Sequence, residues 1–243
     1  WTRVRKWASG DATATVSTSA DILYIWDGSE SPSWSTVGNW SGGSVPGSSD
    51  HIFIPLGVPF YPETTGDLSI DPQGSLTIAA GASLTVNGTL TTNDKLTIES
   101  SVNAGSGSLI VTGTATGQVT YNRFLREGDD TGDKHLLSSP VGGQLIAELI
   151  DKYGPKIDSV RSWNEFSGVW DRLQSGEFIS GKGYNIYQDD VSDGEYSFTG
   201  SIVTTASFTA TSPFEDPFSL RGIDPYGNDD PATINWTDGR GYT

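Results

Sequence analysis

Short apolar triplets, separated by Gly, Ser, Thr and Asn, dominate the chain between residues 67 and 120. In each triplet the outer two residues are apolar and would share one face of a β-strand, while the middle residue would face the other way. Strands this short cannot bury an apolar face alone, so we expect each to stack on the next copy. The pattern predicts a β-solenoid; a tightly wound sandwich or an ordinary β meander is the alternative. The triplets are Leu68-Ser69-Ile70, Leu76-Thr77-Ile78, Leu84-Thr85-Val86, Leu96-Thr97-Ile98 and Leu109-Ile110-Val111.

A tryptophan-rich stretch precedes the triplets. Residues 22–26 and 51–55 are strand candidates. Trp26, Trp34 and Trp40 lie in this stretch, each close to Gly, Ser or Asn residues that are typical of turns. The first turn of a solenoid exposes an apolar cross-section and unpaired backbone groups, so it needs a cover. We therefore expect these residues to form a hydrophobic cap. The alternative is a platform that stacks on sugar rings, with Trp34 and Trp40 as candidates.

The remainder of the chain has the pattern of a second β-rich unit with one helix. Residues 145–150 form a short amphipathic helix pattern that ends before Gly154 and Pro155. Strand candidates at hairpin spacing suggest a β-sandwich. These candidates are residues 160–163, 168–170, 184–187, 196–198 and 201–203.

The predicted fold class is therefore mainly β: a short, β-helix-like solenoid with a Trp-rich cap, followed by a β-sandwich-like domain containing one short helix. We assign residues 1–20 to an N-terminal arm or linker, 21–118 to the solenoid-like domain with its cap, and 119–243 to the sandwich-like domain. The chain contains no Met, so we do not expect Trp1 to be a translation start, and we expect a processed product or part of a longer protein.

Charge and composition exclude several classes of partner. The chain has 30 Asp and Glu against 14 Lys and Arg, a formal net charge of −16, which disfavours nucleic acids and anionic membranes. Cys is absent, so disulfides and zinc-thiolate sites are excluded. No apolar run approaches the length of a membrane span.

No catalytic motif stands out, and we expect no enzyme activity. There is no Gly-x-Ser-x-Gly sequence, and the only histidines, His51 and His135, lie in strand-like segments. The enzyme alternative is a polysaccharide-degrading β-helix protein, which would need acidic and basic residues in a groove. The charged residues between Leu68 and Tyr121 are only Asp71, Asp94, Lys95 and Glu99.

Candidate binding residues lie in the second unit. Asp129, Asp130 and Asp133 form an oxygen-rich segment that could hold Ca²⁺, with a solvated acidic turn as the alternative; no other cofactor is expected. Trp163 and Trp170 are further candidates for stacking on carbohydrate.

A set of loosely spaced motifs from residue 22 onward resembles the secreted and cell-surface proteins exported by the type IX secretion system of Bacteroidetes. These motifs are Ile25-Trp26-Asp27-Gly28, Ser33-Trp34, Gly38-Asn39-Trp40, Val45-Pro46, Asp50-His51-Ile52-Phe53-Ile54-Pro55, Tyr121-Asn122-Arg123-Phe124, His135-Leu136-Leu137-Ser138-Ser139-Pro140-Val141, Ser180-Gly181-Lys182-Gly183-Tyr184 and Phe198-Thr199-Gly200. Asp158-Ser159-Val160 also resembles the O-glycosylation acceptor pattern of Bacteroidetes, with Ser159 as the acceptor.

The resemblance implies an extracellular or cell-surface location and a structural or adhesive role in a surface adhesin, fibre or surface layer. The implied partners are the type IX machinery during export, other surface proteins or further copies of the chain, and glycans. Further strands normally follow the family's "Ile-Asn-Trp" motif, here Ile234-Asn235-Trp236. We therefore expect a sandwich that is incomplete at its C-terminal end and self-assembly by strand complementation. A carbohydrate-binding module of a larger secreted protein is the alternative function.

Overall fold

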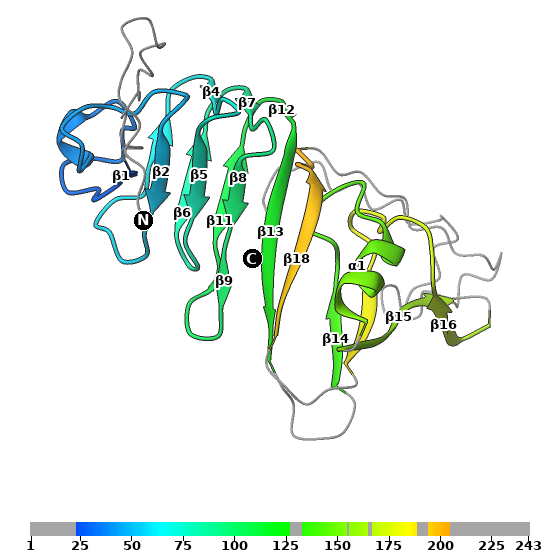
Figure 1. Cartoon of the computed structure of the whole chain (residues 1–243). Coiled ribbons are helices and arrows are strands. Elements are labelled where there is room, and N and C mark those ends of the chain that lie inside the picture. The colour runs from blue at the N-terminus through cyan, green and yellow to red at the C-terminus, as the bar shows by residue number, and fades with distance from the viewer. Residues whose placement is uncertain (1–22, 127–132, 155, 165–166, 189–193, 205–243) are drawn as a thin grey trace, which may run out of the picture.

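The computed structural model describes residues 23–126, 133–154, 156–164, 167–188 and 194–204. It contains 46% strand and 7% helix, which confirms the predicted mainly β class. A β-solenoid of about four turns leads into a second β-rich part with a single short α-helix. Figure 1 shows the solenoid strands side by side, with the tryptophan-rich turns at one end and the second part at the other.

The solenoid is built from three sheets whose strands pair in parallel from one turn to the next. The long sheet, in spatial order, contains β1 (Leu23–Ile25), β2 (His51–Ile54), β5 (Ser75–Ile78), β8 (Leu96–Ile98), β13 (Gln118–Leu125) and β18 (Gly194–Ser201). The second contains β3 (Glu63–Thr64), β6 (Ser83–Val86) and β11 (Ser108–Val111), and the third β4 (Leu68–Ser69), β7 (Leu90–Thr91) and β12 (Ala115–Thr116). A small hairpin of β9 (Ser100–Ser101) and β10 (Gly105–Ser106) interrupts the turn after β8.

The triplets stack between turns, and not each on the next triplet along the chain. Leu76 of β5 pairs with Leu96 of β8, whereas Leu84 of β6 pairs with Leu109 of β11. Consecutive triplets therefore belong to different sheets, and the Leu76 and Leu84 triplets lie in one turn while the Leu96 and Leu109 triplets lie in the next. The first and third residues of the triplets point inward, and Leu76, Leu84 and Leu96 are almost fully buried. The solenoid core is thus a set of aliphatic rows that run from turn to turn, as the triplet pattern predicts.

The three tryptophans of the first turns form the expected cap, which we define as Trp26, Trp34 and Trp40. Their exposed fractions are 0%, 9% and 3%. The Trp40 ring makes edge contacts with the other two, at centroid distances of 4.9 Å to Trp26 and 4.8 Å to Trp34. A 3₁₀ turn at Val37–Asn39 joins Trp34 to Trp40. The cap therefore covers the apolar end of the solenoid with large rings that are themselves buried.

Both outer edges of the long sheet are closed by hydrogen bonds. At β1, the Ile25 amide donates to the Ser41 hydroxyl, and the Ser41 amide donates to the Ile25 carbonyl. At β18, Ser201 exchanges backbone hydrogen bonds with Gly142, and the Ser197 amide donates to the Tyr153 hydroxyl. An edge strand with unpaired amides invites pairing with another chain. These contacts protect the long sheet from such pairing.

The second part adds the terminal sheet, with one face packed against α1 and β18. Its strands, in spatial order, are β14 (Asp133–Leu137), β17 (Tyr184–Gln188), β15 (Ile157–Asn164) and β16 (Val169–Leu173); α1 spans Ile146–Tyr153. Val160, Tyr184 and Ile186 face this core and are buried. The Phe178 ring bridges Tyr184 and Phe198 of β18, at centroid distances of 4.9 and 5.9 Å. The helix predicted at residues 145–150 is confirmed, and it runs on to Tyr153.

The predicted boundary at residues 118 and 119 falls at the start of β13. This strand pairs in parallel with β8 on one side and antiparallel with β18 on the other. The long sheet therefore continues from the solenoid into the second part without a break.

Acidic side chains of the solenoid tie the corners of successive turns together. The Asp71 carboxylate accepts hydrogen bonds from the hydroxyls of Ser48 and Ser49, which hold its pKa below the ordinary value. The Asp94 carboxylate accepts from the backbone amide of Gln118, at 2.6 Å. At a corner, few backbone amides are paired by a neighbouring strand. A carboxylate that accepts hydrogen bonds there therefore stabilises the corner.

Candidate functional site

The terminal sheet has one face in the core and one face turned away from it. Side chains alternate across a strand, so the residues next to the buried Val160 and Ile186 point to the opposite side. Pairing across the four strands then aligns side chains in rows on that side. We call this side the outer face, and it carries Lys134, Leu136, Asn185, Tyr187, Ser159, Arg161, Trp163, Trp170 and Arg172.

Two tryptophans form an open aromatic pair at one end of the outer face. Trp163 of β15 lies directly opposite Trp170 of β16, and their ring centroids are 5.5 Å apart at an interplanar angle of 66°. The exposed fractions are 40% and 37%. Each ring therefore keeps part of its surface open to solvent, and such rings can stack on the apolar face of a sugar.

Two arginines share one carboxylate beside this pair. Asp158 forms ion pairs with Arg161 and Arg172, with nitrogen to oxygen distances of 3.8 and 3.7 Å. Arg161 also stacks over the Tyr187 ring, 5.3 Å from its centroid. The Nε of Arg161 donates to the Ser159 hydroxyl at 3.0 Å. These contacts hold the two guanidinium groups in place on the sheet.

Asn185 lies between Leu136 and Arg161 in the same row across the sheet. Its side chain is only 6% exposed, and its Oδ1 atom has no hydrogen-bond partner. Leu136 beside it is 73% exposed. Buried amide oxygens are nearly always paired in folded proteins, so an unpaired one indicates a missing donor.

The structure separates the four predicted stacking residues into two groups. Trp34 and Trp40 are buried in the cap, where the Trp40 indole donates to the Trp34 carbonyl at 2.8 Å. Neither ring has an open face for a sugar, so the structure favours the cap over the alternative of a stacking platform at these two residues. Trp163 and Trp170 are exposed and brought together, and stacking at this pair stays a prediction.

Ser159 does not lie where a glycosylation site needs to be. Its side chain is fully buried under the outer face, and its hydroxyl is held by Arg161. A glycosyltransferase could not reach this hydroxyl in the folded chain, so the structure contradicts the prediction of Ser159 as an acceptor.

The predicted Ca²⁺ ligands fall largely outside the described residues. Asp129 and Asp130 lie in 127–132, and Asp133 is the first residue of β14, with its side chain outside the description. Among the residues that the structure describes, no group of three or more His, Asp or Glu is placed to hold a metal ion. The Ca²⁺ prediction stays a prediction.

Arg161, Arg172 and Asn185 were not singled out from the sequence. The available signal was the strand alternation around Trp163, which places Arg161 on the same face. The position of Asn185 beside Arg161 depends on the pairing of β15 with β17, which local sequence does not determine.

Comparison with known proteins found one family. The model of a family described as a domain of unknown function, DUF8693, matches residues 25–213. Searches of curated proteins and of solved structures found no match. Within the described parts of the chain, no helix has the length and apolarity to cross a membrane.

Proposed function

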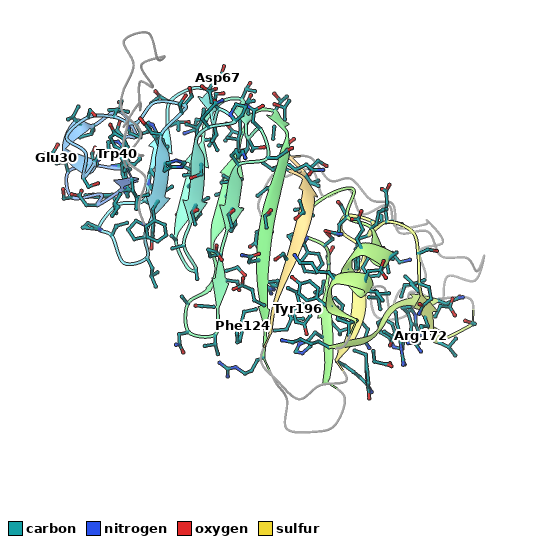
Figure 2. The ribbon with its side chains drawn as sticks, viewed as in Figure 1. Glu30, Trp40, Asp67, Phe124, Arg172 and Tyr196 are labelled. Atoms are coloured by element: carbon teal, nitrogen blue, oxygen red, sulfur yellow. The ribbon has the colours of Figure 1, made fainter. Side chains whose placement is uncertain are left out.

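The chain belongs to the DUF8693 family, and we propose that it is a non-enzymatic, extracellular structural or adhesive protein. In this proposal the capped solenoid is the structural part, and the outer face of the terminal sheet is the adhesive part. The observation that carries the proposal is the exposed Trp163 and Trp170 pair on a sheet at the far end of the molecule from the cap (Figure 2, where Trp40 and Arg172 mark the two ends).

Continuity of the long sheet supports the structural part. Hydrogen-bonded strands run from the cap to β18, and both edges of this sheet are occupied. In a solenoid each turn contacts its neighbours, so the stabilising contacts extend along the whole length of the unit. Such a unit suits a surface adhesin, a fibre or a surface layer. The location and export by a type IX system rest on the sequence resemblance.

Two acidic residues of the triplet region, Asp71 and Asp94, favour the non-enzymatic role over a groove enzyme. Asp71 and Asp94 both accept hydrogen bonds at corners between turns. A glycosidase instead places two carboxylates across the bond that it cleaves. Asp71 and Asp94 therefore have a structural role, because each holds a corner between two turns.

Self-assembly by strand complementation at the C-terminal end of the chain is a further part of the proposal. Residues 205–243 lie outside the description, so that proposal stands on sequence alone. The contacts at β1 and β18 make the long sheet a poor acceptor for a strand of another copy.

A carbohydrate-binding module of a larger secreted protein is the second candidate, and the same tryptophan pair favours it. A panel of soluble polysaccharides tests both functions against an enzyme. We expect retardation of the protein in affinity gels by at least one polymer and no release of reducing ends on long incubation. Trp170→Ala should weaken retardation about tenfold, because a ring that stacks on a nucleic-acid base contributes on the order of 1–3 kcal/mol and we expect a comparable loss for a stacked sugar.

The matched control is Trp34→Phe, which keeps an aromatic ring in the buried cap and should leave retardation unchanged. Release of new reducing ends by an activity that co-purifies with the protein would contradict the non-enzymatic proposal. Lack of retardation by every polymer in the panel would count against carbohydrate as the ligand of the adhesive face.

A further inference from the structure

We infer that the outer face binds an acidic polysaccharide, one with uronic-acid carboxylates, and that Arg161, Arg172 and Asn185 supply its polar contacts. This inference rests on the proposal that Trp163 and Trp170 stack on sugar rings. It adds the class of sugar, which the aromatic pair alone does not select, because every pyranose has an apolar face.

Charge on the outer face is the first reason. The described positive side chains at this face are Lys134, Arg161 and Arg172, and the negative one is Asp158. The face therefore has an excess of positive charge. The whole chain carries −16 and has only 14 Lys and Arg. A local cationic face on a strongly acidic protein attracts anions and orients them there while the rest of the surface repels them.

The arginines keep hydrogen-bonding capacity for a ligand. A guanidinium has five N–H donors in a planar fork. Arg161 uses its Nε on Ser159, and Arg172 uses one Nη2 donor on the Asp158 carbonyl. Both ion pairs to Asp158 are longer than 3.5 Å. Donors of each fork therefore remain for a carboxylate, whose two oxygens match the fork geometry.

Asn185 indicates that the ligand also carries hydroxyl groups. Its Oδ1 atom is buried and has no partner, and it lies beside Arg161 in the row across the sheet. A sugar hydroxyl is a donor of the right size for a buried amide oxygen, whereas a free carboxylate offers no donor. Guanidiniums, an amide oxygen and two indole rings together describe a uronic acid: carboxylate, hydroxyls and an apolar ring face.

The test compares an oligogalacturonate with its methyl ester in calorimetric titrations of the full chain at low salt. The ester removes the charge and keeps the ring and the hydroxyls. We expect the acid to bind about tenfold more tightly, because hydrogen bonds to charged groups exceed neutral ones by roughly that factor. Arg172→Gln should reduce this difference, because one of the two guanidinium forks is lost, and it should weaken binding of the acid more than binding of the ester.

Arg123→Gln is the matched control, since Arg123 is an exposed arginine of the solenoid that donates to Ser106. It removes the same charge elsewhere and should leave the preference for the acid intact. The Arg172 side chain is 54% exposed, so Arg172→Gln should fold, and its thermal transition verifies this.

Three outcomes overturn the inference. Equal binding of acid and ester overturns the acidic class while glycan binding itself stands. Lack of binding by both overturns the inference and counts against the stacking proposal. Poly-glutamate binding as tightly as the oligogalacturonate shows that carboxylates alone are recognised, and an acidic protein segment would then be the better ligand.

Discussion

Trp26→Ala is expected to lower the free energy of unfolding by about 3–5 kcal/mol, the range for removal of a large buried aromatic side chain. Trp26 is the completely buried ring of the cap. Its indole donates to the Phe60 carbonyl at 2.7 Å, and its ring contacts Trp34 and Trp40. The substitution would open a cavity at the end of the solenoid and leave that carbonyl without its donor.

Urea unfolding, monitored by circular dichroism, measures this loss in the free energy of unfolding. Trp170→Ala is the control. Trp170 is also a tryptophan in contact with another tryptophan, but its ring is partly exposed, and we expect a loss within about 1 kcal/mol. If Trp26→Ala does not fold, Trp26→Phe replaces it, because it should lower the free energy of unfolding by a smaller amount. Equal losses at Trp26 and Trp170 would show that the cap does not stabilise the solenoid.

Gly88→Ala is expected to destabilise the solenoid by about 1–3 kcal/mol, because added atoms in a tightly packed site force the backbone to shift. Gly66, Gly88 and Gly113 lie at one corner of successive turns. A Cβ atom on Gly88 would lie 2.6 Å from the backbone carbon of Gly66, and one on Gly113 would lie 2.5 Å from the carbonyl oxygen of Gly88. The turns can stack at this separation only because no side chain stands between them.

Gly66→Ala is the matched control for this prediction. Gly66 is the first of the three, and a Cβ atom there meets nothing within 4 Å. Alanine at this position should be neutral or stabilising by about 0.4–1 kcal/mol, through the reduced entropy of the unfolded chain. Thermal unfolding of the two variants in parallel distinguishes the cases. A loss of stability at Gly66 equal to that at Gly88 would show that backbone conformation, and not turn spacing, is responsible.

Much of the fold could be predicted from the sequence because its elements are short and periodic. The triplet Leu76-Thr77-Ile78 shows which residues face inward, since the period of a strand is two residues. Local sequence does not show which turn it stacks on. That choice depends on the lengths of the corners, and the hairpin of β9 and β10 lies within one of the turns.

The sequence predicts the tryptophan cap, but for a related reason it leaves a stacking platform at Trp34 and Trp40 open as the alternative. Trp34 and Trp163 both follow a serine, so the neighbouring residue does not show which of the two tryptophans is buried. Trp34 is buried because Trp40 packs on its ring, while Trp163 is exposed because its strand face has no covering element among the described residues. Ser159 is likewise buried by Arg161 and its neighbours across the sheet, which a three-residue acceptor motif does not report.

The most direct test of the adhesive face is a nuclear magnetic resonance titration that follows the indole N–H signals of the eight tryptophans. Oligogalacturonate is added to the ¹⁵N-labelled full chain, and the signals are assigned with single Trp→Phe variants. The account predicts that the signals of Trp163 and Trp170 shift together while those of Trp26, Trp34 and Trp40 stay in place. Shifts confined to the cap tryptophans, or no shift at Trp163 and Trp170 under saturating ligand, would contradict it.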